Sequence, residues 1–211
     1  MLSLKQEFDK EKFNFNKIDE SKELVCQLVN KDRMSRQVKR DIIIINVSPI
    51  DRGHCLLVPN VDAGLPQVLT VHSVMLALEV MNLSTSPHIK IAFNSLCAFA
   101  SVNHLHWHLY YQHHHLAVQS VTLSPVPGTS YHTFTDQRYP ALGWVWLLKE
   151  EDTDKLDQVA REVIKLTSWL TDKEVAHNVF ISRYGDIVII PWYDMFVLGG
   201  RGWREARAST G

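Results

Sequence analysis

The stretch SVNHLHWHLYY, residues 101–111, has histidines at three alternate positions in its centre. These histidines are His104, His106 and His108, and the apolar residues that alternate with them are Leu105, Trp107, Leu109 and Tyr111. Successive side chains of a β-strand point to opposite faces, so a strand over 104–111 would gather the imidazoles on one face. The apolar set fits a core, whereas core packing would not select three polar rings in a row. The alternation therefore predicts a functional site on one face of a buried strand.

On both sides of this stretch, hydrophobic periodicity predicts the elements of one domain. Short β-branched or apolar runs predict strands at 42–46, 54–59, 89–94, 143–148, 178–182 and 186–191, the last two joined by a turn at Tyr184-Gly185. Apolar residues at three- and four-residue steps predict two helices, 70–83 with Thr70 as its cap and 152–170. Strands paired by short turns with two inserted helices indicate an α+β domain built on an antiparallel sheet.

Three other segments lack this periodicity. Residues 1–37 are polar and carry Phe8, Phe13 and Phe15, which predicts an N-terminal arm docked onto the body. Residues 120–141 are rich in Ser, Thr, Pro and Gly, which predicts a surface loop. Residues 196–211 show no pattern and predict a disordered tail. Residues 38–195 remain as the main domain.

The bulk composition disfavours several classes of protein. The 211 residues include 22 Lys and Arg against 23 Asp and Glu, a balance that gives no electrostatic reason to expect nucleic acid or an acidic membrane as a partner. Cys26, Cys55 and Cys97 are too few and too widely spaced for a disulfide scaffold. The N-terminus is charged where a secretory signal would be apolar, and no apolar stretch reaches the roughly 18 residues that span a bilayer. We therefore expect a cytoplasmic protein.

The alternating histidines admit three interpretations. The first is a solvent-exposed strand face that happens to carry histidines. This would be the best explanation for a single histidine, but it is the weakest for three in strict alternation. A zinc site is the second, because neutral imidazoles are good ligands; no cysteine pair and no nearby carboxylate supports it, and we expect no metal. The third is nucleophilic catalysis on phosphorus, because an imidazole of pKa about 6.5 is largely neutral near pH 7 and can form a phosphoramidate.

In the third interpretation the central ring, His106, is best placed to attack. Its neighbours can donate hydrogen bonds to phosphoryl oxygens. The preceding residues 98–101, Ala-Phe-Ala-Ser, have little side-chain bulk, so their backbone N–H groups could approach phosphate closely. Positioning and charge stabilisation would then supply most of the rate.

Two motifs resemble those of the histidine-triad superfamily. Residues 101–108 resemble its signature of histidines alternating with hydrophobic residues after a Ser-Val step, and the pair 46–49 (NVSP) and 53–59 (GHCLLVP) resembles its other motif. The longer blocks 12–15, 45–59, 93–111 and 170–178 are similar to the GDP-hexose phosphorylase branch, which includes GDP-D-glucose phosphorylase and GDP-L-galactose phosphorylase. The resemblance runs from about residue 8 to 191. It implies a HIT-like antiparallel sheet with flanking helices, with 38–195 as the catalytic domain.

The resemblance also implies a mechanism. His106 would attack the α-phosphorus of a GDP-hexose, release hexose 1-phosphate and hold GMP covalently; inorganic phosphate would then take up the GMP and leave as GDP. His104 would orient the nucleophile and His54 would support the triad. The groups expected to bind phosphoryl oxygens are His108, Ser101 and Asn94. No organic cofactor is needed, and because histidine-triad proteins often pair through their sheets, a homodimer is a candidate assembly.

The chain departs from this branch at several places. Cys97 stands where the branch has Gly and Leu109 where it has Gly or Ala, and either larger side chain is expected to narrow the site. The run 113–115, three histidines, predicts an exposed polar turn. After Pro191 the sequence diverges, which implies C-terminal truncation. Two alternatives therefore stay open: a nucleotide-binding protein that is inactive or regulatory, and a hydrolase that passes the adduct to water.

Overall fold

The structure, a computed structural model, describes residues 3–29, 39–134, 139, 141–149, 152–182 and 186–192. Its strands are β1 Leu24–Leu28, β2 Asp41–Ile45, β3 Cys55–Val58, β4 Ile89–Asn94, β5 Trp107–Tyr111, β6 Leu123–Pro125, β7 His132–Phe134, β8 Gly143–Trp146, β9 His177–Ile181 and β10 Ile187–Pro191. Its α-helices are α1 Glu20–Glu23, α2 Val71–Leu83 and α3 Leu156–Asp172. Short 3-10 helices are η1 Phe15–Lys17, η2 Val61–Ala63, η3 Ala117–Ser120 and η4 Asp152–Lys155.

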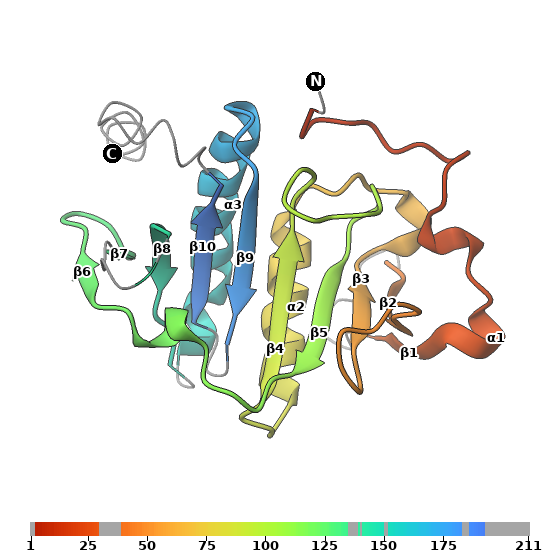
Figure 1. The fold of residues 1–211 in the computed structure, drawn as a ribbon, viewed down its shortest axis with the longest axis horizontal. Helices are drawn as coiled ribbons and strands as arrows, with labels where there is room; N and C mark the ends of the chain where they lie inside the picture. The colour runs from red at the N-terminus through yellow and green to blue at the C-terminus, as the bar shows by residue number, and fades with distance from the viewer. Residues whose placement is uncertain are drawn as a thin grey trace.

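The strands form one antiparallel sheet in the order β1-β2-β3-β5-β4-β9-β10-β8-β7-β6. Helices α2 and α3 lie side by side against one face of this sheet (Figure 1). This architecture confirms the predicted α+β class with an antiparallel sheet and flanking helices. Within the described ranges, no helix is long and apolar enough to cross a membrane.

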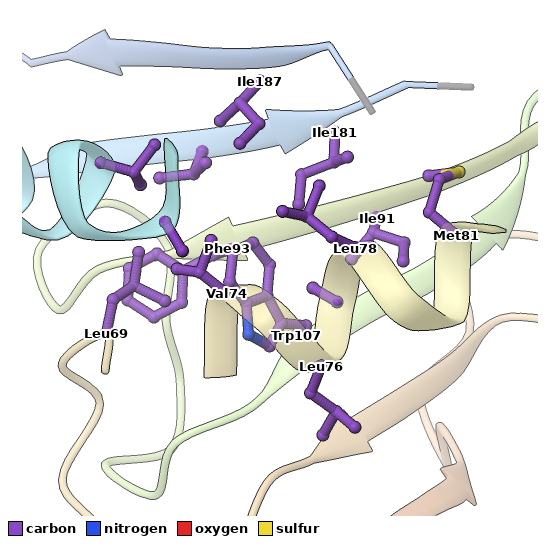
Figure 2. Close-up of a cluster of buried hydrophobic side chains, with 14 of the residues drawn as sticks. Leu69, Val74, Leu76, Leu78, Met81, Ile91, Phe93, Trp107, Ile181 and Ile187 are labelled. Carbon is purple, nitrogen blue, oxygen red and sulfur yellow. The ribbon is translucent and has the colours of Figure 1, made fainter. Parts of the chain in front are cut away.

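The main core fills the space between the two helices and the middle of the sheet (Figure 2). Helix α2 points Val74 and Leu78 at strand residues Ile91 and Ile181, and each of these four side chains is almost completely buried. Full burial of one such side chain contributes about 1.5–3 kcal/mol, so this layer is the main source of stability beneath β4 and β5.

Helix α2 begins where the sequence predicts. The hydroxyl of Thr70 accepts a hydrogen bond from the backbone N–H of Ser73 at 3.1 Å, and the Ser73 hydroxyl accepts one from the N–H of Thr70 at 3.0 Å. This reciprocal capping box satisfies two donors at the helix start. Helix α3 starts later than predicted, because residues 152–155 form a 3-10 turn before Leu156.

The opposite face of the sheet carries two separate apolar clusters. One consists of Phe15, Ile42, Ile44, Leu56, Val58 and Val61, and the other of Val118, Phe134, Val145, Phe180 and Val188. Strands β5 and β4 lie between the strands of these clusters, and cross-strand pairing puts His108 beside Leu56 and Ala92. Since Phe93, Trp107 and Leu109 belong to the core on the helix side, the alternate residues His108 and Asn94 lie on this opposite face.

Several predicted boundaries need correction. The surface loop predicted over 120–141 contains β6 and β7, which extend the sheet beyond β8. The strand predicted over 143–148 ends at Trp146. Residues 24–28 of the predicted arm form β1 and pair with β2. The predicted turn at Tyr184-Gly185 and the predicted tail 196–211 lie outside the described residues.

Candidate active site

The histidine stretch is only partly a strand. Strand β5 begins at Trp107, so the strand predicted over 104–111 is too long at its start. The alternation nevertheless holds in three dimensions: Leu105, Trp107 and Leu109 belong to the core under the helices. The rings of the three histidines lie on the other face, where the centroids of His106 and His108 are 5.2 Å apart.

The neutral ring of His106 is held in one tautomer, with its proton on Nδ1. Its Nδ1 lies 2.7 Å from the backbone carbonyl oxygen of His104, and because a carbonyl only accepts, Nδ1 carries the proton. Burial lowers the pKa of His106 to about 4, so the ring is neutral at pH 7. The lone pair therefore lies on Nε2, the arrangement that nucleophilic attack on phosphorus requires.

His104 is covered by the N-terminal segment. The backbone N–H of Phe15 donates to Nδ1 of His104 at 3.1 Å, and the Phe15 ring centroid lies 5.3 Å from that of His104 and 5.1 Å from that of His106. The Phe8 ring meets His104 edge-on at 5.0 Å. His104 is fully buried, and this burial lowers its pKa to about 4. The cover keeps both rings uncharged.

His108 and His54 form a hydrogen-bonded relay. The N–H of Ile50 donates to Nδ1 of His54 at 3.0 Å, so in the neutral ring Nε2 of His54 carries the proton. Nε2 of His54 lies 2.9 Å from Nδ1 of His108, which must then accept. The proton of neutral His108 is thereby placed on Nε2. Burial, reinforced by His106 and His54, lowers the pKa of His108 to about 3, and burial also lowers the pKa of His54.

The loop that follows β4 is tightly wound. The carbonyl of Ser95 accepts from the N–H groups of Ala98 at 3.0 Å and Ala100 at 3.4 Å, so both amides already have an acceptor within the loop. The amides of Phe99 and Ser101 have no hydrogen-bond partner among the described residues. Cys97 and Phe99 have positive φ of 63° and 73°, where an L side chain is strained.

Asn94, at the end of β4, is tied to this loop through Asn178. The side-chain amide of Asn178 donates to Oδ1 of Asn94 at 2.7 Å and to the carbonyl of Ala98 at 3.0 Å. Trp192 donates in turn from its indole nitrogen to Oδ1 of Asn178. This network fixes the Asn94 side chain on the same face as His108.

Of the expected site residues, the structure brings together His54, His104, His106 and His108, with Asn94 on the neighbouring strand. No hydrogen bond within the described ranges connects Ser101 to them. Leu109 lies in the core on the helix side, so the expectation that it narrows the site is wrong. The histidines at 113–115 are exposed as predicted. In the described part of the chain, no group of three or more His, Cys, Asp or Glu residues could hold a metal ion.

Sequence reasoning missed Gln67. Its side chain is 1% exposed, and it hydrogen-bonds to the backbone of His106 and of Asn94. It lies in the aperiodic run LPQVL, residues 65–69, and the only signal was a polar residue between apolar ones. A polar residue in such a run can equally be an exposed loop residue or a buried residue that hydrogen-bonds to the backbone, so the sequence pattern does not identify Gln67.

Comparison with known proteins finds a matching family model and several relatives. Residues 1–110 match the family model "GDPGP1-like, N-terminal domain". GDP-D-glucose phosphorylase 1 of Danio rerio is 40% identical over 184 residues, which are 87% of this chain and 50% of the relative. The Homo sapiens protein of the same name is 39% identical over 183 residues, 86% of this chain and 47% of the relative. GDP-L-galactose phosphorylase 2 of Arabidopsis thaliana is 30% identical over 200 residues, 88% of this chain and 45% of the relative.

The chain spans about half the length of these curated relatives. Among solved structures, yeast Ap4A phosphorylase in complex with Ap4A matches with a TM-score of 0.56 and 18% identity, over 72% of this chain and 56% of that chain. At this identity the likeness concerns the fold, and it supports the HIT-like sheet.

Proposed function

The chain belongs to the GDPGP1-like family, and from this premise we propose that it is a nucleotidyltransferase that moves the guanylyl group of a GDP-hexose onto inorganic phosphate. The names of the relatives support GDP-D-glucose as the donor. The products would be GDP and a hexose 1-phosphate. The proposal covers the donor, the acceptor and the histidine intermediate.

The proposed reaction has two displacements at one phosphorus atom. Nε2 of His106 attacks the α-phosphorus; an N–P bond forms, the bond from this phosphorus to the bridging oxygen breaks, and hexose 1-phosphate leaves with the electron pair. An oxygen of inorganic phosphate then attacks the same phosphorus, the N–P bond breaks, and GDP leaves. Each step is an exchange of nucleophile and leaving group, so the covalent intermediate divides one difficult substitution into two easier ones.

Neutral hydrogen-bond donors would stabilise the negative charge on the oxygens of the phosphoryl group. The relay through His54 supports His108 as a donor through Nε2. Asn94 and Ser101 are proposed as further phosphoryl contacts, and His104 as the residue whose carbonyl orients the nucleophile. Donors aimed at a transferring phosphoryl group in a buried site are worth more than in water, because the local dielectric is low.

One observation carries the proposal: the proton of His106 is held on Nδ1 by the carbonyl of His104 at 2.7 Å. A central imidazole that is neutral, buried and bare at Nε2 suits attack on phosphorus. A ring exposed to water and protonated near pH 6.5 would not.

The test is to mix the protein with GDP-glucose, without phosphate, and to measure its intact mass. We expect an added GMP group in the wild type and none in His106→Asn, while the exposed control His114→Asn keeps the adduct. Added phosphate should release the group as GDP. Release as GMP in water alone would favour the hydrolase, and nucleotide binding without any adduct would favour the inactive form.

A further inference from the structure

We propose that Gln67 is a positioning residue, which holds the backbone of His106 where its ring can act as the nucleophile. The inference rests on the proposed function, because it assigns a purpose to the geometry around His106. It follows from four hydrogen bonds of Gln67 and from the way that two strands of the sheet separate at this point.

His106 lies beyond the ends of both strand ladders that hold β5. On one side, the pairing of β4 with β5 runs from Ile89–Tyr111 to Ala92–His108. On the other side, the pairing of β3 with β5 stops at Leu57–Trp107. The register of β4 and β5, continued by two residues, would set Asn94 opposite His106. The backbone of the proposed nucleophile is therefore not held by a neighbouring strand.

The side-chain amide of Gln67 occupies this gap. Its Oε1 accepts from the backbone N–H of His106 at 2.9 Å, and its Nε2 donates to the carbonyl of His106 at 3.1 Å. The same Nε2 donates to the carbonyl of Asn94 at 2.9 Å. The two bonds to His106 are those that a paired strand residue would make. Gln67 thus replaces a ladder residue and joins the ends of β4 and β5.

Gln67 is itself fixed in place. Its backbone N–H donates to Oδ1 of Asn103 at 2.9 Å, and the side-chain amide of Asn103 donates to the carbonyl of Glu7 at 2.9 Å. Nearby, the N–H of Leu105 donates to the carbonyl of Leu65 at 2.8 Å. Segment 65–67 and segment 103–106 are therefore held to each other by both backbone and side chains.

A change at Gln67 should reach the ring of His106 through the backbone. The proton on Nδ1 depends on the 2.7 Å contact with the carbonyl of His104, two residues earlier in the same unpaired stretch. If the amide is lost, the N–H and carbonyl of His106 lose buried partners, and the stretch must move to recover them. A displacement of about 1 Å in a reacting group can cost on the order of 100-fold in rate.

Two variants separate the contributions of the amide. Gln67→Met has a similar length and removes all three side-chain hydrogen bonds. Gln67→Glu keeps an oxygen that accepts from His106, but it places a second oxygen against two carbonyls. Gln119→Glu is the matched control, because Oε1 of Gln119 also accepts a backbone N–H, from Leu116 at 3.0 Å, at an exposed position in a segment that contributes no residue to the candidate site.

The readouts are the rate constant for GMP–protein formation from GDP-glucose, the Kd for GDP, and the ¹⁵N chemical shifts of the His106 ring. For Gln67→Met and Gln67→Glu we expect the rate constant to fall on the order of 100-fold with an unchanged Kd. We also expect the ring to change from the Nδ1–H form to a mixture of tautomers. Gln119→Glu should match the wild type in all three.

The outcomes distinguish this inference from the proposed function. If the wild type forms the adduct and both Gln67 variants form it at the wild-type rate, the positioning proposal is overturned while the function stands. If the wild type forms no adduct, the proposed function fails. The ring spectrum then decides the role of Gln67: a changed tautomer in either folded variant supports positioning of the His106 ring, and identical spectra overturn it.

Discussion

Nδ1 of His106 lies 2.7 Å from the backbone carbonyl oxygen of His104, so the first residue of the triad fixes the proton of the second through its main chain. The ring of His104 is turned elsewhere, with its own Nδ1 accepting from Phe15. The orientation of the proposed nucleophile therefore depends on backbone geometry, and on side chains such as Gln67 that hold this backbone.

The first prediction concerns the pH dependence of stability. Burial lowers the pKa of His104, His106 and His177 to about 4 and that of His108 to about 3. In the unfolded chain these rings have a pKa near 6.5, so between pH 6.5 and 4 the unfolded state binds more protons. The contribution of these rings to the free energy of unfolding is therefore fully present above about pH 6.5, and it is lost as the pH falls through this window.

Denaturant unfolding at a series of pH values measures this effect. At pH 5 the slope should correspond to an uptake of roughly three to four protons by these histidines. His177→Asn should lower the uptake by about one, because one buried ring is removed. A flat profile between pH 6.5 and 4.5 would show that the rings are hydrated and titrate normally.

The second prediction concerns the aromatic cover. Phe15 is buried and packs against His104 and His106, whereas its neighbour Phe13 is 57% exposed. Phe15→Ala should lower the free energy of unfolding by about 3–5 kcal/mol and raise the pKa of His106 toward 6.5, because water then reaches the ring. Phe13→Ala should change stability by only about 0.5 kcal/mol. Chemical denaturation and NMR titration give the two quantities; equal effects of the two variants would contradict the assigned cover.

The third prediction concerns the relay from His54 to His108. His54→Leu removes the donor that places the proton of His108 on Nε2, and we expect adduct formation to slow by about tenfold. His108→Leu should slow it by about 100-fold, because the phosphoryl donor itself is lost. Since His54 acts through His108, the double variant should be no slower than His108→Leu alone. Single-turnover rates of the four proteins test this, and multiplicative losses would show that the two rings act independently.

The fourth prediction concerns Cys97, whose φ is 63°. This left-handed conformation strains any side chain with a Cβ, which agrees with the Gly that the family resemblance implies at this position. Cys97→Gly should therefore be more stable than Cys97→Ala by about 1 kcal/mol. Both variants lack the thiol, so thermal or denaturant unfolding isolates the backbone effect. A more stable Ala variant would contradict it.

The sequence predicts those elements whose signals are local. Helix α2 follows from the spacing of apolar residues after Thr70, and its capping box lies within four residues. Strands β2 and β3 consist almost entirely of consecutive apolar residues, and β4 has apolar residues at four of its six positions; the sheet buries all three along most of their length. The alternation of the histidines also predicts correctly that Leu105, Trp107 and Leu109 face the core, because successive side chains of an extended segment point to opposite faces. Tyr111, at the end of the strand, is 43% exposed, so its predicted place in the core is wrong.

What the sequence does not predict depends on contacts between distant segments. Strands β6 (LSP) and β7 (HTF) have only three residues each; β7 pairs with β8 and β6 pairs with β7, and nothing in either short sequence predicts this pairing. The stretch before Trp107 is held by Leu65, Gln67 and Phe15, which lie far away in the chain. The tautomer of His106 also cannot be predicted from the sequence. The pattern of histidines does not show which ring nitrogen carries the proton, whereas the contact with the carbonyl of His104 does.

The sheet order has a consequence for how the molecule opens. Among the strands that the structure describes, β5 and β4 are the fourth and fifth of ten, with helix α2 packed behind them (Figure 1). Fraying of a sheet starts at its outermost strands, which have a neighbour on one side only, and reaches interior strands last. His108 and Asn94, which lie on these interior strands, are therefore expected to open last. His104 and His106 precede β5, so their protection depends on Gln67 and Phe15 rather than on the strand order.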